Sequence, residues 1–551
     1  MSNIFMKNNV RIASLVLAIT CLVSCNKYLD VDPKDQVTNS ALWSSSGNAD
    51  LFLNNIYSSL PDPYNKLESE DTWTDNAMAG YNYYDSRAIY ARSVYTAVNA
   101  PNYWIHFNNV RKCNVFIQNV TASTLPDAWK KQRLAEARYL RAYFYELLWT
   151  HYGGVPIITD VLNENTQGDS IFRVRNTDEE TFQFIDNELA AIADDLPTKS
   201  DAGRATKGAA FTLKGWCELF EASAVKNPGN DPAKWALAAA TNKQVIDLGV
   251  YSLFPDLETL FFEGNNNNSE TIFARTYLGG SATLGGSKEG LWGLRNVGGA
   301  QVGYGGVNPT QELVDDYEMD NGLPITDPAS GYDPQNPYVN REKRFYQSII
   351  YDGCNWLGYV ILTRRGVGSK NEIDLTNGSG GGPNTGYALR KTLDPKYAVS
   401  GSNHLNSANY IIFRYAEVLL SYAEAQNEAV GPDASVQDAV NQVRARSELP
   451  ALPTDLTQDE MRTAIRRERR VEFSFEDKRW YDLIRWKTAE INLNTPSLHC
   501  MVIEKVNGVW TYTVQPAADG SRIFYADKNY VLPIPQDAID KNSKLVQNPN
   551  Y

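Results

Sequence analysis

Apolar residues that recur every three or four positions are the feature that most constrains the fold of this chain. The steps are three, four and three along Ala137, Leu140, Phe144 and Leu147. The same spacing recurs along residues 209–220 and 415–429. This periodicity predicts amphipathic helices. Alanine recurs on the stripes, and small side chains let paired helices approach closely. We therefore predict a mainly α fold built on helical pairs, with any sequence repeat degenerate.

The pattern changes between about residues 250 and 410. Paired or tripled glycines occur at 279–280, 285–286, 298–299, 305–306 and 380–382. Proline, asparagine and aspartate are frequent, and short apolar runs such as 359–362 predict a few short strands. We expect a loop-rich insertion at about 251–410 between helical parts at about 41–250 and 411–489, followed by a C-terminal segment, 490–551. Long loops on a rigid scaffold commonly carry binding function.

The N-terminus has the layout of a signal peptide. Lys7 and Arg11 precede an apolar run, 12–21, that is too short to span a bilayer. The following Leu-Val-Ser-Cys ends at Cys25 and resembles a bacterial lipoprotein signal. We expect residues 1–24 to be removed, Cys25 to carry the lipid that anchors the chain, and residues 25–40 to form a tether. The alternative is an ordinary secretory peptide with a coincidental cysteine.

Composition excludes several classes of protein. The net charge of −13 argues against a nucleic-acid partner, which would require a basic face. Cys113, Cys217, Cys354 and Cys500 are widely spaced, and the four histidines do not stand at metal-ligand spacing. We therefore expect no disulfide framework, no metal and no cofactor. The chain has 32 Tyr and 12 Trp residues, whose rings combine an apolar face with a polar tip and suit partly exposed surfaces that stack on ligands.

Short blocks run through the chain in a fixed order. They are YLDVDP at 28–33, AEARYLRAYFY at 135–145, YGGVPI at 152–157, GRATKGAA at 203–210, NPTQEL at 308–313, FRYAEVLL at 413–420, NQVRAR at 441–446, ERRVE at 468–472, KRWYDLIRW at 478–486, LPIP at 532–535 and QNPNY at 547–551. Together they resemble the SusD/RagB-like outer-membrane lipoproteins of Bacteroidetes over nearly the whole mature length. Two departures are Asp477 and Asn550, where that family usually has glycine.

The resemblance implies a fold and a role. The expected fold is a single domain, 41–551, in which tetratricopeptide-like helical pairs form a curved scaffold and a loop-rich half packs on it. The expected role is capture of oligosaccharides at the cell surface, with the protein acting as a lid on a TonB-dependent SusC-like transporter. It places the chain on the outer membrane, facing the exterior.

A carbohydrate binder needs exposed Trp or Tyr faces for the apolar sides of sugar rings and polar side chains for the hydroxyl groups. In the resembling family, ligand contacts come from an early loop and from the loop-rich half. We expect glycan contacts from Trp73, Asn76, Tyr81, Tyr83, Tyr84 and Arg87 in the first area, and from Trp292, Tyr304, Asn355, Trp356 and Tyr359 in the second. For each single ring, packing in the core is the alternative.

Other motifs favour structure over chemistry. The arginines between 462 and 470 interleave with carboxylates at helical spacing, which indicates ion pairs rather than a phosphate site. The chain has no Gly-x-Ser-x-Gly elbow, and no feature selects one carboxylate pair for glycoside hydrolysis. We therefore expect a glycan-binding lipoprotein that is not an enzyme. The alternatives are a helical-repeat lipoprotein that binds peptide or protein cargo and, more remotely, a surface glycoside hydrolase.

Overall fold

The computed structural model describes residues 42–280, 285–376, 381–399 and 405–551. The fold is mainly α, as predicted, with a few short strands. The predicted signal peptide, the lipid site at Cys25 and the tether to residue 40 lie outside the described residues. The limits proposed for the single domain stay a prediction.

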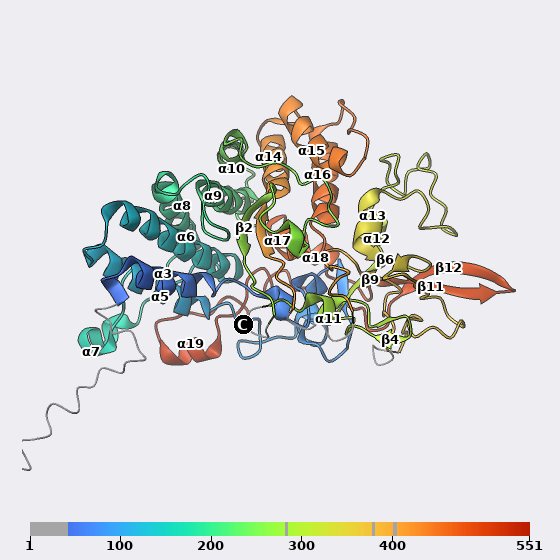
Figure 1. Cartoon of the computed structure of the whole chain (residues 1–551), viewed down its shortest axis with the longest axis horizontal. Coiled ribbons are helices and arrows are strands. Elements are labelled where there is room, and N and C mark those ends of the chain that lie inside the picture. The colour runs from blue at the N-terminus through green and yellow to red at the C-terminus, as the bar shows by residue number, and fades with distance from the viewer. Residues whose placement is uncertain (1–41, 281–284, 377–380, 400–404) are drawn as a thin grey trace, which may run out of the picture.

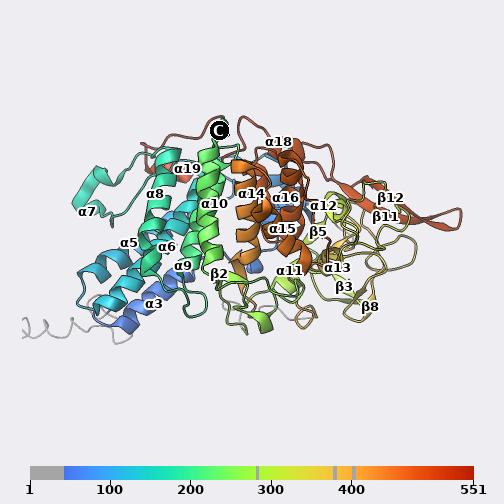
Figure 2. The same cartoon turned by 90° about the horizontal axis from the view of Figure 1, so that it is seen from above.

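The first part of the scaffold is a row of long helices, each packed against the next (Figures 1 and 2). The helices are α3 (Ser46–Tyr57), α5 (His106–Ala122), α6 (Asp127–Tyr152), α8 (Asp178–Ile192), α9 (Lys207–Ala222) and α10 (Pro232–Asp247). The apolar stripe at 137–147 lies in α6 and the stripe at 209–220 lies in α9, which confirms both helical predictions.

The row continues after a long excursion of the chain, because α14 packs directly against α10. The helices of this second part are α14 (Tyr415–Val430), α15 (Ala434–Arg446), α16 (Gln458–Glu472), α17 (Arg479–Arg485) and α18 (Ala489–Asn492). The view in Figure 2 shows α8, α10, α14 and α16 side by side. One apolar core runs under both parts of the row.

Local hydrogen bonds fix where several helices begin. Thr177 before α8 and Thr457 before α16 each accept a backbone N–H from the third helical residue, and that residue's glutamate accepts the N–H of the threonine in return. Such capping boxes satisfy donors that have no partner inside the helix. At the end of α6, Gly154 passes so close to the carbonyl of Asn176 that a Cβ would overlap it.

The remaining helical elements are short and belong to the loops. They are α4 (Asp85–Ala88), α7 (Glu164–Gln167), α11 (Lys288–Trp292), α12 (Gln311–Asp316), α13 (Lys343–Ser348), α19 (Gln536–Lys541) and the 3-10 turns η1 (Pro63–Asn65), η2 (Glu70–Trp73), η3 (Tyr90–Arg92), η4 (Gly168–Ile171), η5 (Ala193–Asp195) and η6 (Glu263–Asn265). The loop-rich half has its own apolar core.

The described strands form antiparallel pairs. The pairs are β1 (Ala77–Ala79) with β5 (Val307–Pro309), β2 (Thr271–Arg275) with β10 (Tyr410–Arg414), β3 (Asn296–Val297) with β4 (Ala300–Gln301), β6 (Ile349–Ile350) with β9 (Ala388–Leu389), β7 (Asn355–Trp356) with β8 (Tyr359–Val360), and β11 (His499–Val506) with β12 (Val509–Pro516). The last pair is the hairpin at the right edge of Figure 1 and contains the strand predicted at 509–514.

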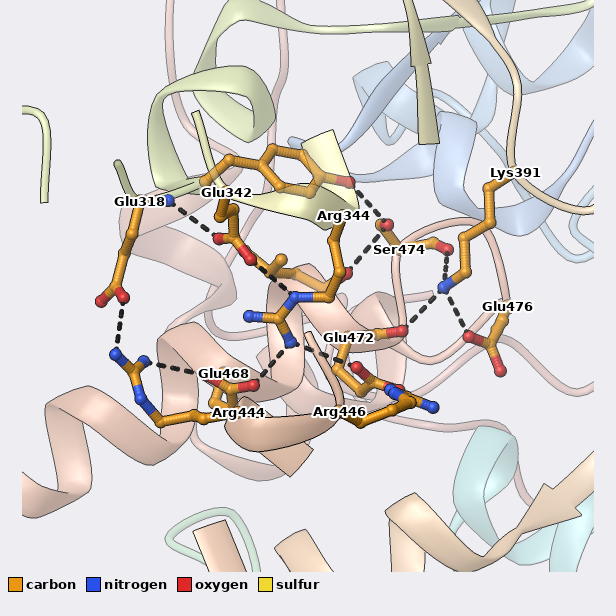
Figure 3. Close-up of polar contacts among 12 residues, drawn as sticks. Glu318, Glu342, Arg344, Lys391, Arg444, Arg446, Glu468, Glu472, Ser474 and Glu476 are labelled. Atoms are coloured by element: carbon orange, nitrogen blue, oxygen red, sulfur yellow. Dashed lines mark hydrogen bonds and ion pairs between the residues drawn. The ribbon is translucent and has the colours of Figure 1, made fainter. Parts of the chain in front are cut away.

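A buried ion network joins the scaffold to the loop-rich half (Figure 3). Glu472 at the end of α16 meets the guanidinium groups of Arg344 at 3.1 Å, of Arg414 at 2.6 Å, and of Arg446. Glu476 meets Lys391 at 2.6 Å. We call these six residues, with their further partners Glu270, Glu318, Glu342, Arg444 and Glu468, the ion network. Arginines of α16 also pair with carboxylates elsewhere, so their structural interpretation is confirmed.

Two further findings concern the cysteines and the helices. Cys113, Cys217, Cys354 and Cys500 are all buried and unbonded to one another. Among the described residues, no helix is both long and apolar enough to cross a membrane.

Candidate functional site

A cluster of tyrosine rings stands on the loop between β1 and α4. The rings of Tyr81 and Tyr83 are 5.3 Å apart between centroids, and those of Tyr83 and Tyr84 are 5.2 Å apart. Tyr83 is 69% exposed and Tyr81 is half-buried, whereas Tyr84 lies buried beneath them. The loop therefore offers two accessible rings on a third that supports them.

The loop-rich half completes this cluster because β1 pairs with β5. The pairing brings Gly80 so close to Gly305 that a Cβ would overlap the carbonyl oxygen. Tyr81, Arg295 and Tyr304 consequently line one shallow hollow. The guanidinium carbon of Arg295 stands 6.0 Å from the ring centre of Tyr81, and Tyr304 is 45% exposed. We call Tyr81, Tyr83, Tyr304 and Arg295 the tyrosine platform.

The platform carries groups suited to hydroxyl ligands. Partial burial raises the pKa of Tyr81 above its ordinary value, and the guanidinium of Arg295 offsets part of that rise. The phenol therefore keeps its proton at neutral pH and can donate a hydrogen bond, while the flat ring offers an apolar face.

The other residues predicted in the first area have structural roles. Trp73 is buried, with its ring 5.1 Å from that of Tyr90. Asn76 is fully buried; it donates to Asp71 at 3.0 Å and accepts from Arg470 at 2.9 Å. Arg87 is buried and donates to the carbonyl of Ala518 at 2.6 Å. Our expectation that Asn76 and Arg87 reach a ligand at the surface is wrong, because both are engaged inside the protein. Trp73 lines a different cleft, which is described below.

Two tryptophans in the second area are also interior. Trp292 is 1% exposed and donates from Nε1 to the carbonyl of Lys66 at 3.0 Å. Trp356 is 3% exposed and lies under the guanidinium of Arg390 at 5.5 Å. Both belong to the core of the loop-rich half. The expectation that they present an accessible face is corrected, because this half needs large side chains to build a core between short strands.

Asn355 and Tyr359 are exposed on the β7–β8 hairpin. Tyr359 lies against the turn between β3 and β4, where a Cβ on Gly298 would overlap its ring. No ring contact joins Tyr359 to the tyrosine platform in the described parts of the chain. The structure thus brings together four of the predicted residues, Tyr81, Tyr83, Tyr84 and Tyr304, and leaves Asn355 and Tyr359 as a separate exposed pair.

The structure also contains a cleft of about 600 Å³ that the sequence did not predict. It lies between the scaffold and the loop that carries η1 and η2, and we call it the inner cleft. Its walls include Glu70, Tyr103, Tyr143, Glu146, Trp216, Asp477 and Tyr481. Tyr143, Glu146 and Trp216 lie on α6 and α9, where the helical stripes predict only core packing. The one sequence signal was Asp477, which replaces the usual glycine of the resembling family at a left-handed backbone position, φ 57°.

Comparison with known proteins settles the family. The sequence model of the SusD family matches residues 269–551, more than half of the chain. The chain is a member of the SusD family. A second model, described as starch-binding associating with outer membrane, matches residues 27–214. The resemblance inferred from the ordered blocks is therefore confirmed.

Relatives of this SusD family member cover almost its full length. A SusD-like protein of Bacteroides ovatus is 28% identical over 498 residues, which is 88% of this chain and 83% of the relative. A crystal structure of a SusD-like protein from Bacteroides fragilis superposes with a TM-score of 0.78 at 27% identity, covering 94% of this chain and all of the other. A second B. fragilis structure, described as a SusD-like carbohydrate binding protein, gives 0.76 at 26% identity, covering 92% of this chain and all of the other.

Proposed function

We propose that this SusD family member binds an oligosaccharide on the tyrosine platform and does not alter it chemically. The observation that carries the proposal is the convergence of Tyr81 and Tyr83 with Tyr304 and Arg295, from segments more than two hundred residues apart, on one accessible surface. The names of the B. fragilis carbohydrate binding protein and of the starch-binding family model support a carbohydrate as the ligand.

We also propose that the captured sugar passes to a TonB-dependent SusC-like transporter. The chain would stand on the outer membrane through lipid on Cys25, with its platform facing the exterior. The lipoprotein-like signal and the family description as associating with the outer membrane support this placement. Co-purification of the lipidated protein with a SusC-like barrel from the native membrane tests the partnership, and failure to recover any such barrel contradicts it.

Alanine variants of the platform test the ligand site. Each ring that stacks on a sugar contributes on the order of 1 kcal/mol, so Tyr83→Ala and Tyr304→Ala should each weaken glycan binding about five-fold, and the double variant more. Isothermal titration against the oligosaccharide selected from a glycan array measures the change. Tyr525→Ala, which truncates a ring that is 49% exposed elsewhere, is the matched control and should bind as the wild type does.

Unchanged glycan affinity in the double variant would reject the platform as the site. The same array should include peptides, since selective retention of a peptide would favour the alternative cargo. Release of shorter sugars from a polysaccharide by the purified protein would support the hydrolase alternative.

A further inference from the structure

The inner cleft contains three carboxyl groups that form no ion pair with any described residue: those of Glu146 and Asp477, which are buried, and that of Glu70, which is half-buried. Glu146 on α6 is 3% exposed and accepts a hydrogen bond from the indole Nε1 of Trp216 at 3.0 Å. Glu70 accepts the hydroxyl proton of Tyr103, which is a neutral donor. Asp477 accepts from the Ser69 hydroxyl at 2.6 Å and from the Glu70 backbone at 2.9 Å. Within the described part of the chain, the hydrogen bonds to these three carboxyl groups therefore all come from neutral donors.

Two lysines lower the pKa of these carboxyl groups, Lys478 that of Glu146 and Lys66 that of Glu70, but neither forms an ion pair with them. The ammonium of Lys478 is bound to Glu417 at 2.9 Å and to the carbonyl of Ile412 at 2.8 Å, so it is already committed to other oxygens. Lys66 is exposed at the mouth of the cleft. Burying a carboxylate is unfavourable unless it is paired with an opposite charge, so the cleft is matched to a positively charged group.

Polar atoms that face the cleft remain without partners. The second carboxyl oxygen of Glu146 and the hydroxyl of Tyr143 have no hydrogen-bond partner among the described residues, although both side chains are more than nine-tenths buried. Buried polar groups in proteins are normally hydrogen-bonded. Both residues line the inner cleft, so a polar ligand in the cleft has two groups there that are open to a hydrogen bond.

Aromatic rings form much of the remaining wall. Trp73, Trp216 and Tyr481 line the cleft, and the rings of Trp216 and Tyr481 lie 6.3 Å apart. Aromatic faces attract cations and also pack against the apolar face of a sugar ring. A metal ion fits less well, because no three His, Cys, Asp or Glu side chains converge to hold one anywhere in the described ranges.

We propose that the inner cleft binds the protonated primary amine of a small hydroxyl-rich molecule, an amino sugar with a free amine. The ammonium group would lie between Glu70 and Glu146, and Tyr143 and Asp477 would bond the hydroxyl groups. The volume of about 600 Å³ falls in the ordinary range of small-molecule sites. This second site is separate from the tyrosine platform, so it goes beyond the proposed function and does not depend on it.

Titration calorimetry of the purified mature protein at pH 7.5 tests the proposal with glucosamine, N-acetylglucosamine and glucose as probes. Glucosamine should bind at least ten-fold more tightly than the other two, which lack the charge. Glu146→Gln and Glu70→Gln should each weaken glucosamine binding at least ten-fold. Glu164→Gln, on the exposed helix α7, is the matched control and should leave it unchanged.

Equal affinities for glucosamine and glucose, or no binding of glucosamine, would overturn the proposal. Unchanged glucosamine binding in both glutamine variants would also overturn it, provided that their melting temperatures show them folded. If they unfold, the preference of the wild-type protein for glucosamine over N-acetylglucosamine decides alone. Tyr83→Ala separates the two sites, because it should weaken glycan binding on the platform and leave glucosamine binding intact.

Discussion

Two groups of buried carboxylates meet at neighbouring residues of the same segment. Glu476 belongs to the ion network, where Lys391 and Arg414 neutralise it at 2.6 and 2.7 Å. Asp477, the next residue, belongs to the inner cleft and is held by neutral donors. Glu476 is therefore paired with opposite charges, whereas its neighbour Asp477 has no ion-pair partner among the described residues.

The acidity of the two groups differs accordingly. Burial alone would raise the pKa of Glu472 in the ion network, but the guanidinium groups of Arg446, Arg414 and Arg344 outweigh it and hold the pKa well below its usual range. In the cleft, burial and the nearby Asp477 raise the pKa of Glu70 to about 7. The carboxylates of the ion network are all paired with cations that join the two halves of the protein. The carboxyl groups of the cleft have no such ion pair in the described part of the chain and are available to a ligand.

The largest expected effect is on the network side of this comparison. Replacing Glu472 by alanine removes a partner of Arg344, Arg414 and Arg446 at once and leaves buried positive charge. We expect the free energy of unfolding to fall by about 3–5 kcal/mol, measured by urea denaturation. Glu164→Ala on the surface should change it by less than about 0.5 kcal/mol. A loss below about 1 kcal/mol for Glu472→Ala would show that the remaining carboxylates suffice.

The cleft side should respond to pH with the opposite sign. Burial raises the pKa of Glu146 from 4.5 to about 7, with Glu417 adding to the rise and Trp216 and Lys478 opposing it. The folded state therefore holds this proton more tightly than the unfolded state. Its stabilising contribution is complete below pH 4.5 and is lost as pH rises to about 7, which amounts to ~3 kcal/mol.

Comparison with Glu146→Gln isolates this contribution. The unfolding free energy of the wild type minus that of the variant should decrease between pH 4.5 and pH 8, measured by urea denaturation at each pH. A constant difference would mean that Glu146 is ionised in the folded protein throughout, and the contrast with Glu472 would fail.

A smaller difference in stability is expected between removing a tyrosine hydroxyl beside the ion network and removing one in the inner cleft. The Tyr317 hydroxyl is buried beside the network and lies 3.1 Å from the hydroxyl of Ser474, so Tyr317→Phe should destabilise the protein by about 1 kcal/mol. Tyr143→Phe removes a hydroxyl that has no protein partner in the described residues and should change stability by less than about 0.5 kcal/mol. Equal losses in the two variants, measured by denaturation, would mean that Tyr143 bonds a fixed neighbour.

The helices were predictable from sequence, but the surfaces between them were not. The stripe in α6 fixes the helical register, yet α6 is buried on nearly all sides, so periodicity cannot show that Tyr143 and Glu146 face an opening. In the hairpin of β7 and β8, Trp356 points inward and Asn355 outward. Two-residue strands are too short for an alternating pattern to indicate which side is buried.

Tyr81 and Tyr304 illustrate the same limit from the opposite direction. Each was predicted to contact a ligand because of its residue type and its place in a loop. The same reasoning was applied to Trp292, yet Tyr81 and Tyr304 are accessible whereas Trp292 is buried. What decides the outcome is the pairing of β1 with β5, a long-range contact that neither segment encodes by itself.

The pairing of β2 with β10 has a consequence for how such a chain can diversify. Tyr410 stands opposite Arg275 in this pair, so the polypeptide leaves the helical row and returns to it at the same place. Closing a longer excursion adds only a slowly growing entropic penalty. Loops of the excursion that take no part in the ion network can therefore lengthen or shorten while the row beneath stays intact, so one helical base can present different surfaces.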